Sequence, residues 1–151
     1  MSMDVAPTTS LIQARDWLRD QVDEGTHCPL CLQYAKVYRR AINSGMARAL
    51  IVMYREGGRD WIHKPTVLRG LGAAARDESL LRYWDLVQPD PDRHGWWRVT
   101  PRGAAFVHGS VRVPRYARVY DGRCLGLTGP SIDIHEALGN QFSVSKLMAG
   151  E

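Results

Sequence analysis

The sequence has 151 residues, 44% of them hydrophobic and 24% charged, with a formal net charge of +4. A chain of this size and apolar content can bury the core of one domain, and its composition is not that of a disordered protein. The longest apolar run, Ala49–Tyr54, is too short to span a bilayer, and residues 1–10 lack the features of a signal peptide, so we expect a cytoplasmic protein.

Positive charge is concentrated in two blocks of the chain. Residues 36–69 carry eight basic and two acidic side chains, and residues 96–123 carry six and one. Net-acidic segments precede, separate and follow these blocks. Solvated helix faces would explain the pattern, and so would a surface that binds an acidic polymer.

The N-terminal segment, residues 1–43, is predicted to form two helices around a cysteine pair. Ser10 is a typical N-cap residue, and apolar residues recur at helical spacing from Leu11 to Val22. Cys28 and Cys31 follow, and a second helix is predicted from Leu32 to Ile42.

The central segment, residues 44–109, alternates helices with short strands. Residues 46–55 are apolar nearly all round, which predicts a buried helix. Thr100-Pro101 is typical of a helix start, with Thr100 as the cap and proline in the first turn. The other predicted elements are a strand at 61–63, helices at 66–71 and 73–87, a loop at 89–95, a strand at 96–99 and a helix at 102–108.

The C-terminal segment, residues 110–151, is predicted to begin with a β-hairpin. Asp121-Gly122 lies between two extended runs, 116–120 and 123–127, and this dipeptide favours a tight hairpin turn. Asp133 and Glu136 have capping-box spacing before a short helix, and a last helical turn is expected at 143–148.

The order of elements from Ser44 to Gly109 resembles the winged helix-turn-helix domains of bacterial regulators. The best local match is residues 80–87, Leu-Leu-Arg-Tyr-Trp-Asp-Leu-Val, followed by residues 97–103, Trp-Arg-Val-Thr-Pro-Arg-Gly. We therefore expect an α+β fold: a mainly helical winged-helix core with a small β-wing, an N-terminal helical extension and a C-terminal β-hairpin. The whole chain also resembles uncharacterised phage and prophage proteins.

The resemblance implies a double-stranded DNA-binding surface. The predicted helix 73–87 would enter the major groove, and the wing, residues 90–98, would reach the backbone or the minor groove. Acidic residues in that helix, Asp77, Glu78 and Asp85, repel phosphate, so a protein-binding role stays open. The residues implied in nucleic-acid binding are Arg76, Ser79, Arg82, Arg93, Arg98, Arg102, Arg112 and Arg115.

The pair Cys28 and Cys31 has the spacing of half a zinc site. A second protomer could complete it, or two more ligands from this chain. The motif also resembles the active-site turn of glutaredoxin-like proteins, although the polar segment before it argues against that fold. Two ordinary reduced thiols are the third interpretation. Candidates for the missing ligands are His27, His63, His94, His108, His135 and Cys124.

We expect from these observations a non-enzymatic, transcription-regulatory DNA-binding protein, with a possible Zn site at Cys28 and Cys31. The alternative is a protein-interaction module that inhibits or adapts a host or phage machine. A thiol oxidoreductase is a third hypothesis. A homodimer is also expected, for which the terminal helices 11–22 and 143–148 are candidate surfaces.

Overall fold

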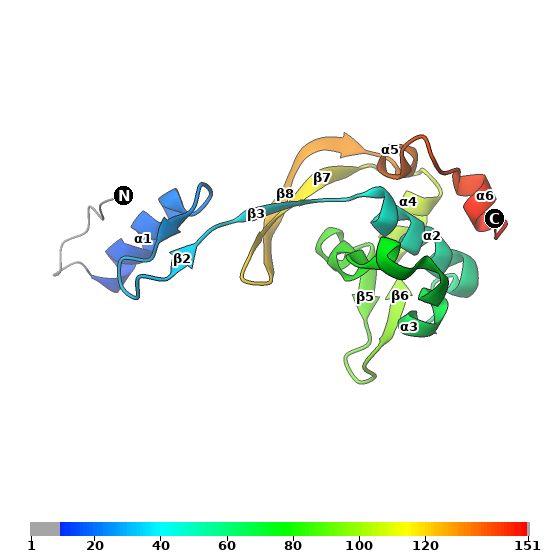
Figure 1. Cartoon of the computed structure of the whole chain (residues 1–151), viewed down its shortest axis with the longest axis horizontal. Coiled ribbons are helices and arrows are strands. Elements are labelled where there is room, and N and C mark those ends of the chain that lie inside the picture. Colours follow the sequence, from blue (N-terminus) through cyan, green and yellow to red (C-terminus); the bar gives the residue numbers. More distant parts are fainter. Residues whose placement is uncertain (1–9, 151) are drawn as a thin grey trace. The chain divides into compact units, whose positions relative to one another are not determined.

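The computed structural model describes residues 10–150 and confirms a protein of mixed helices and antiparallel strands. The chain divides into two compact units (Figure 1). Unit 1 takes residues up to Arg40 together with Arg118–Gly126, and unit 2 takes Ala41–Ala117 and the residues from Leu127 onward. No helix within residues 10–150 has the length and hydropathy needed to cross a membrane.

Unit 1 is built on helix α1 and a two-stranded hairpin. Ser10 caps α1 (Leu11–Gln21) through a reciprocal capping box with Gln13, as the N-cap prediction requires. The unit has a small apolar core. Its side chains come from α1 and the residue after it, from residues 35–37, and from Tyr120 near the turn at residues 121–122. These are Val22, Ala35 and Val37, with Leu18 and Tyr120 packed against them.

The predicted helix 32–42 is wrong. The segment forms strands β2 (Tyr34–Ala35) and β3 (Tyr38–Ala41), and β2 pairs antiparallel with β1 (Thr26–His27). Only Ala35 and Val37 are buried between Gln33 and Arg40, so burial alternates with a period of two, as in a strand.

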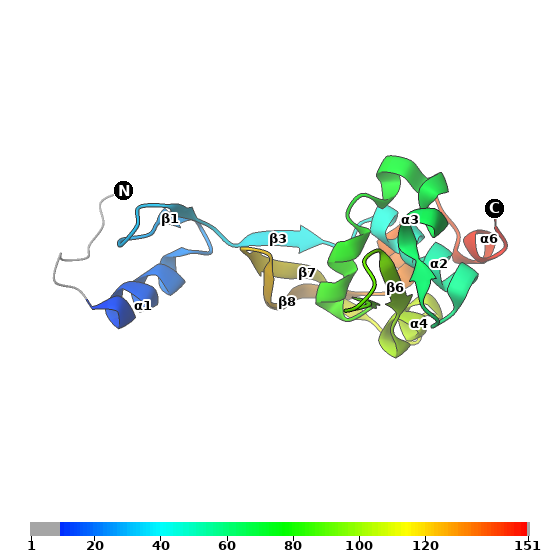
Figure 2. The same ribbon diagram turned by 90° about the horizontal axis from the view of Figure 1, so that it is seen from below.

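Unit 2 is centred on helix α2 (Ser44–Gly57), capped by Asn43. Seven of its side chains are buried, which confirms the predicted buried helix. It contacts most of the other helices of the unit, including α3 and α4 (Figure 2). The helices of this unit are α3 (Lys64–Val67), α4 (Pro101–Val107), α5 (Ile134–Leu138) and α6 (Val144–Met148), with 3₁₀ helices η1 (Arg69–Ala75) and η2 (Glu78–Trp84).

Three short strands of unit 2 form an antiparallel sheet in the order β4-β6-β5. They are β4 (Ile62–His63), β5 (Val87–Pro89) and β6 (Trp96–Val99), with Ile62 opposite Trp97 and Val87 opposite Val99. The predicted strands at 61–63 and 96–99 are thereby confirmed.

The predicted helix 73–87 is wrong as a single α-helix. Two 3₁₀ segments, η1 and η2, take its place; Gly72 has a φ of 54° inside η1, and Asp85 ends η2 in the left-handed region. Val87 already belongs to β5. Gly72 just before this stretch, and Asp77 and Asp85 within it, outweigh its helical spacing of apolar residues.

A second sheet has the order β3-β7-β8, with β7 (Val113–Tyr120) and β8 (Arg123–Ile132). Asp121 and Gly122 both have positive φ, 49° and 72°, as expected for the predicted tight turn. The capping box of Asp133 and Glu136 is also confirmed, at the start of α5.

Candidate nucleic-acid interface

The loop between β5 and β6 is held in shape by Asp90. Its carboxylate accepts hydrogen bonds from the backbone N–H of Asp92 (2.9 Å) and from Nε of Arg93 (2.8 Å). These donors, the Asp92 N–H first, hold the pKa of Asp90 below its ordinary value of 3.8. These bonds hold Arg93 in the loop, which Figure 1 shows at the end of the β5-β6 hairpin.

The two faces of the β4-β6-β5 sheet differ in character. Ile62, Val87 and Val99 are buried in the core of unit 2. Because side chains alternate along a strand, their neighbours point to the other face. That surface, which we call the wing face, consists of Trp61, His63, Arg93, Trp96 and Arg98.

The wing face pairs each of its arginines with an aromatic ring. The guanidinium of Arg98 lies 4.4 Å from the ring centroid of Trp61, and that of Arg93 lies 4.4 Å from Trp96. The ring of His63 lies 5.6 Å from that of Trp96. Cation–π contacts hold both guanidinium groups in place beside flat apolar surfaces. Planar cations beside aromatic rings suit phosphates and exposed bases.

A hollow of about 380 Å³ adjoins this surface, on the side of η2. Its lining includes Lys64, whose Nζ lies 4.0 Å from the ring centroid of Trp97 and 2.7 Å from a carboxylate oxygen of Glu78. The side chains of that ion pair are only 12% and 13% exposed, so Glu78 offsets the charge of Lys64. Ser79, Arg82, Arg93 and Trp96 also line the hollow.

The β5-β6 hairpin is joined to α4 through hydrogen bonds of Thr100 and Gly103. Thr100 caps α4 by accepting a hydrogen bond from the Gly103 N–H (2.9 Å), and its hydroxyl donates to the Asp85 carbonyl (2.5 Å). Its own N–H donates to the Leu86 carbonyl (3.1 Å). The predicted helix start at Thr100 is therefore confirmed, and it ties α4 to the end of η2 and to β5.

The structure gathers only some of the residues implied in nucleic-acid binding. Arg93 and Arg98 lie on the wing face, and Ser79 and Arg82 lie in the adjoining hollow. Arg82 also reaches the Ser79 carbonyl (3.3 Å) and stacks on Tyr83, 4.8 Å from its ring centroid. Two of these residues belong to the predicted wing, residues 90–98, and two to η2, which lies within the predicted helix 73–87.

The remaining implied arginines lie elsewhere. Arg76 is exposed at the end of η1, and Arg102 is exposed in the first turn of α4. Arg115 is half-buried on β7. Arg112 is engaged by Glu136 (2.7 Å) and Asp133 (3.6 Å), so two carboxylates offset its charge.

Sequence reasoning missed Trp61 and His63 on the wing face and Lys64 in the adjoining hollow. His63 was named only as a candidate metal ligand. The signal lay in the alternation of two short strands, Trp61-Ile62-His63 and Trp96-Trp97-Arg98-Val99, which places the aromatic and cationic residues on one face once the strands pair.

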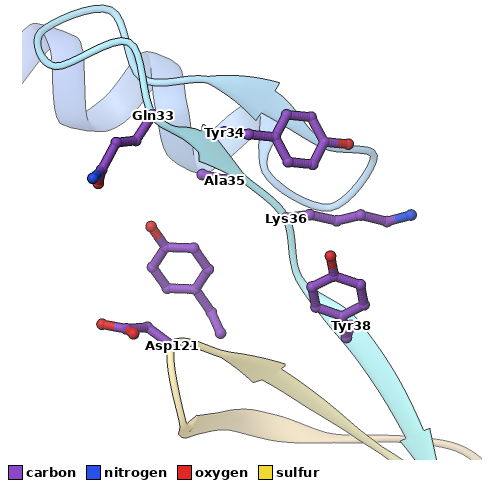
Figure 3. A pocket seen from close by; sticks show the side chains of 7 residues that line it. Gln33, Tyr34, Ala35, Lys36, Tyr38 and Asp121 are labelled. Atoms are coloured by element: carbon purple, nitrogen blue, oxygen red, sulfur yellow. The ribbon is translucent and has the colours of Figure 1, made fainter.

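Unit 1 carries a second hollow, of about 290 Å³, lined by tyrosines. Figure 3 shows the side chains of Tyr34, Lys36, Tyr38 and Asp121 around it. Tyr34 and Tyr38 are 57% and 52% exposed, and the Lys36 ammonium lies 5.6 Å from the Tyr38 ring centroid. This hollow has one cation beside an aromatic ring, Lys36 beside Tyr38, whereas the wing face has two such pairs.

The cysteine pair lies in the loop that joins β1 to β2. Cys28 donates its N–H to the Gln33 carbonyl (2.8 Å) and accepts at its own carbonyl from the Leu32 N–H (2.9 Å). The pKa of the Cys28 thiol is lowered, first by the N–H of Cys31 and then by that of Leu30, both of which donate to its sulfur. No helix follows the motif, so the helix that lowers the thiol pKa in glutaredoxin-like proteins has no counterpart here.

Among residues 10–150, no group of three or more His, Cys, Asp and Glu side chains is arranged to hold a metal ion. The candidate histidines have other neighbours: His27 packs on Tyr34, His63 contacts Thr66 (2.6 Å) and His108 contacts the Tyr54 hydroxyl (2.8 Å). The described part of the chain therefore brings no third side chain of these types to Cys28 and Cys31 as a metal-binding group.

Comparisons of this chain with protein-family models, with curated proteins and with solved structures gave no match.

Proposed function

We propose that this chain is a non-enzymatic nucleic-acid-binding protein of winged-helix type that contacts duplex DNA through its wing face. The observation that carries the proposal is the pairing of Arg93 and Arg98 with Trp96 and Trp61 on the solvent side of the sheet. A regulatory role, in a phage or prophage, rests on the resemblance of the sequence alone.

The order of elements supports the winged-helix part of the proposal. Unit 2 runs α2, β4, α3, η1, η2, β5, β6 and α4, and its strands have the order β4-β6-β5. A winged helix has a helix, a strand, a helical pair and then the hairpin that forms the wing, with the first strand beside the last. The 3₁₀ character of η1 and η2 is the main departure from that pattern.

This departure shifts the expected contact from the helix to the wing. A 3₁₀ segment of seven residues, η2, is shorter than the recognition helices that enter a major groove. Glu78 offsets Lys64 there. On the wing, Arg98 lies against the ring of Trp61, and Arg93 lies against that of Trp96 while its Nε is paired with Asp90 (2.8 Å), so phosphate would bind the terminal amino groups of Arg93. We therefore propose mainly backbone contacts, with limited sequence preference.

The alternative is a protein-interaction module. The acidic side chains around η2, Asp77, Glu78 and Asp85, favour it, because they repel a phosphate backbone beside the hollow. In that case the aromatic wing face would anchor a protein partner, and the chain would bind duplex DNA weakly at any salt concentration.

The test is fluorescence anisotropy of a labelled random duplex, titrated with the full chain at several salt concentrations. Each neutralised phosphate contributes about 0.9 to the slope of log K against log salt, so Arg93→Ala with Arg98→Ala should lower the slope by about 1.8 and weaken binding about 30-fold at about 150 mM salt. The double variant Arg93→Lys with Arg98→Lys keeps the charges and should retain most of the slope.

The matched control is Arg19→Ala with Arg123→Ala. Both side chains are exposed and belong to unit 1, and the net charge changes by the same amount. An equal loss in the control and the wing variant would show attraction by overall charge only, and unchanged binding in the wing variant would overturn the proposal. No binding by the unaltered chain at about 50 mM salt would favour the protein-interaction alternative.

A further inference from the structure

The loop of Cys28 and Cys31 lies beside an apolar surface that the proposed DNA contact does not use. A hollow of about 240 Å³ is lined by Leu11, Ala14, Leu18, Leu30 and Cys28. Leu11 and Leu30 are 72% and 54% exposed. Nearby in sequence, Ile12 and Leu32 are 71% and 61% exposed. Monomeric proteins rarely expose several large apolar side chains together, so these exposed side chains are typical of a surface that contacts a partner.

The two thiols belong to one short loop. Residues 28–33 join β1 to β2, and the strands pair up to the loop, His27 with Tyr34. Leu32 takes a left-handed backbone conformation, with a φ of 67°, which closes the loop just after Cys31. The Leu32 N–H donates to the Cys28 carbonyl (2.9 Å), so both cysteines lie within one hydrogen-bonded turn. Both cysteines are reduced and at least partly exposed.

A tetrahedral thiolate site needs four ligands, and this loop supplies two. We propose that Cys28 and Cys31 bind a Zn²⁺ ion together with the same two cysteines of a second copy of this chain. The two loops would meet across their apolar surfaces, so that Leu11 and Leu30 become buried as the metal is shared. A second copy is the one partner certain to present two more thiols at this spacing.

Charge and protons balance in this assembly. Four thiols release four protons to the buffer and bind one Zn²⁺, which leaves a net charge of −2 on the site, and no oxidant or reductant takes part. Arg15 lines the same hollow as Cys28, so each copy brings one guanidinium close to the site. Two such cations match the charge of the assembled centre.

The test uses the full chain, reduced and freed of metal, with Co²⁺ as the spectroscopic probe. We expect thiolate-to-cobalt charge-transfer and intense visible bands typical of tetrahedral sulfur ligation, saturating at one ion per two chains, and displaced by Zn²⁺. Sedimentation at the same concentrations should show a dimer with Zn²⁺ and a monomer with a chelator. The variant Cys28→Ser with Cys31→Ser should lose both responses, whereas Cys124→Ser should keep both.

A separate variant tests the apolar contact. Leu30→Asp leaves all thiols in place, lies on an exposed position and should weaken the Zn²⁺-dependent dimer at least about tenfold. Saturation at one ion per chain in a monomer would overturn the shared site. So would metal binding by the double cysteine variant equal to that of the unaltered chain, or a dimer whose stability does not depend on Zn²⁺.

Discussion

The substitution Gly103→Ala is expected to loosen the attachment of α4 to the β4-β6-β5 sheet. An alanine Cβ at this position would lie 2.0 Å from the Leu86 carbonyl oxygen and 2.8 Å from Cγ1 of Val99. Real Cβ atoms do not approach other atoms within 3.0 Å, and the oxygen belongs to the backbone, so α4 or the strand must move. The same Leu86 oxygen accepts the Thr100 N–H, and that hydrogen bond is lost when they separate.

The expected cost follows from three terms. Overpacking against the backbone costs about 3 kcal/mol, and the broken hydrogen bond costs about 1 kcal/mol. Alanine recovers about 1 kcal/mol relative to glycine inside a helix. The free energy of unfolding should therefore fall by about 3 kcal/mol, which lowers Tm by roughly 6–12 °C in a chain of this length.

Guanidinium unfolding followed by tryptophan fluorescence measures this change as a lower transition midpoint at an unchanged slope. The matched control is Gly70→Ala, because nothing lies within 4 Å of a Cβ built there. We expect the control to change stability by less than about 1 kcal/mol. Equal stability of the two variants would refute the close approach of Gly103 to Leu86.

Three further predictions concern other positions. Trp84→Phe removes the indole N–H that donates to the Pro114 carbonyl (2.7 Å). It should lower the free energy of unfolding by about 1–3 kcal/mol, measured by guanidinium unfolding. An unchanged midpoint would contradict a stabilising role for this hydrogen bond. The folded pKa of Asp90 lies below 3.8, so its contribution to stability is present above that pH and is lost as the pH falls through the folded pKa. NMR should show the Arg93 side chain losing its fixed position over that pH range. The variant Asp90→Asn should cause the same change at neutral pH. The lowered pKa of Cys28 predicts that iodoacetamide alkylates it faster than Cys124 below pH 9.0, as peptide mass spectrometry would show; equal rates would oppose the prediction.

Elements with strong local signals could be predicted from the sequence. The buried helix α2 follows from a run that is apolar nearly all round, and Ser10, Thr100 and Asp133 each cap a helix where their residue type predicts it. The turn at Asp121-Gly122 needs two residues that tolerate positive φ, and that dipeptide supplies them. In each of these cases the determinant lies within a few residues of the element.

Elements decided by distant contacts could not be predicted in the same way. Residues 38–41 form β3 because they pair with β7, which begins at Val113, far along the chain. The prediction of a helix from Leu32 to Ile42 took no account of this pairing. Residues 73–87 carry the spacing of a helix, but Asp85 turns the chain into β5, and the bonds from Thr100 hold that turn.

The candidate site shows the same division. The wing arginines Arg93 and Arg98 were found because the resemblance marked the loop that carries them. Trp61 and His63 were not, because their place beside these arginines depends on the register of β4 with β6, and a shift of one residue would bury them. The ion pairs of Arg112 with Glu136 and Asp133 could not be predicted, because these carboxylates lie near it in space but not in sequence.

Neither unit is one continuous stretch of chain, and this constrains how the gene can be divided. Residues 118–126, at the end of the β7-β8 hairpin, belong to unit 1, and Tyr120 packs against its core. Removing the N-terminal 40 residues would uncover Tyr120 and take away Asp23, the carboxylate partner of Arg118. Because the truncation also removes most of β3, the neighbour of β7 in the sheet, the shortened chain would expose an unpaired strand edge prone to self-association. A domain exchange between proteins of this kind would have to carry two separate segments, and recombination at a single crossover could not transfer unit 1 intact.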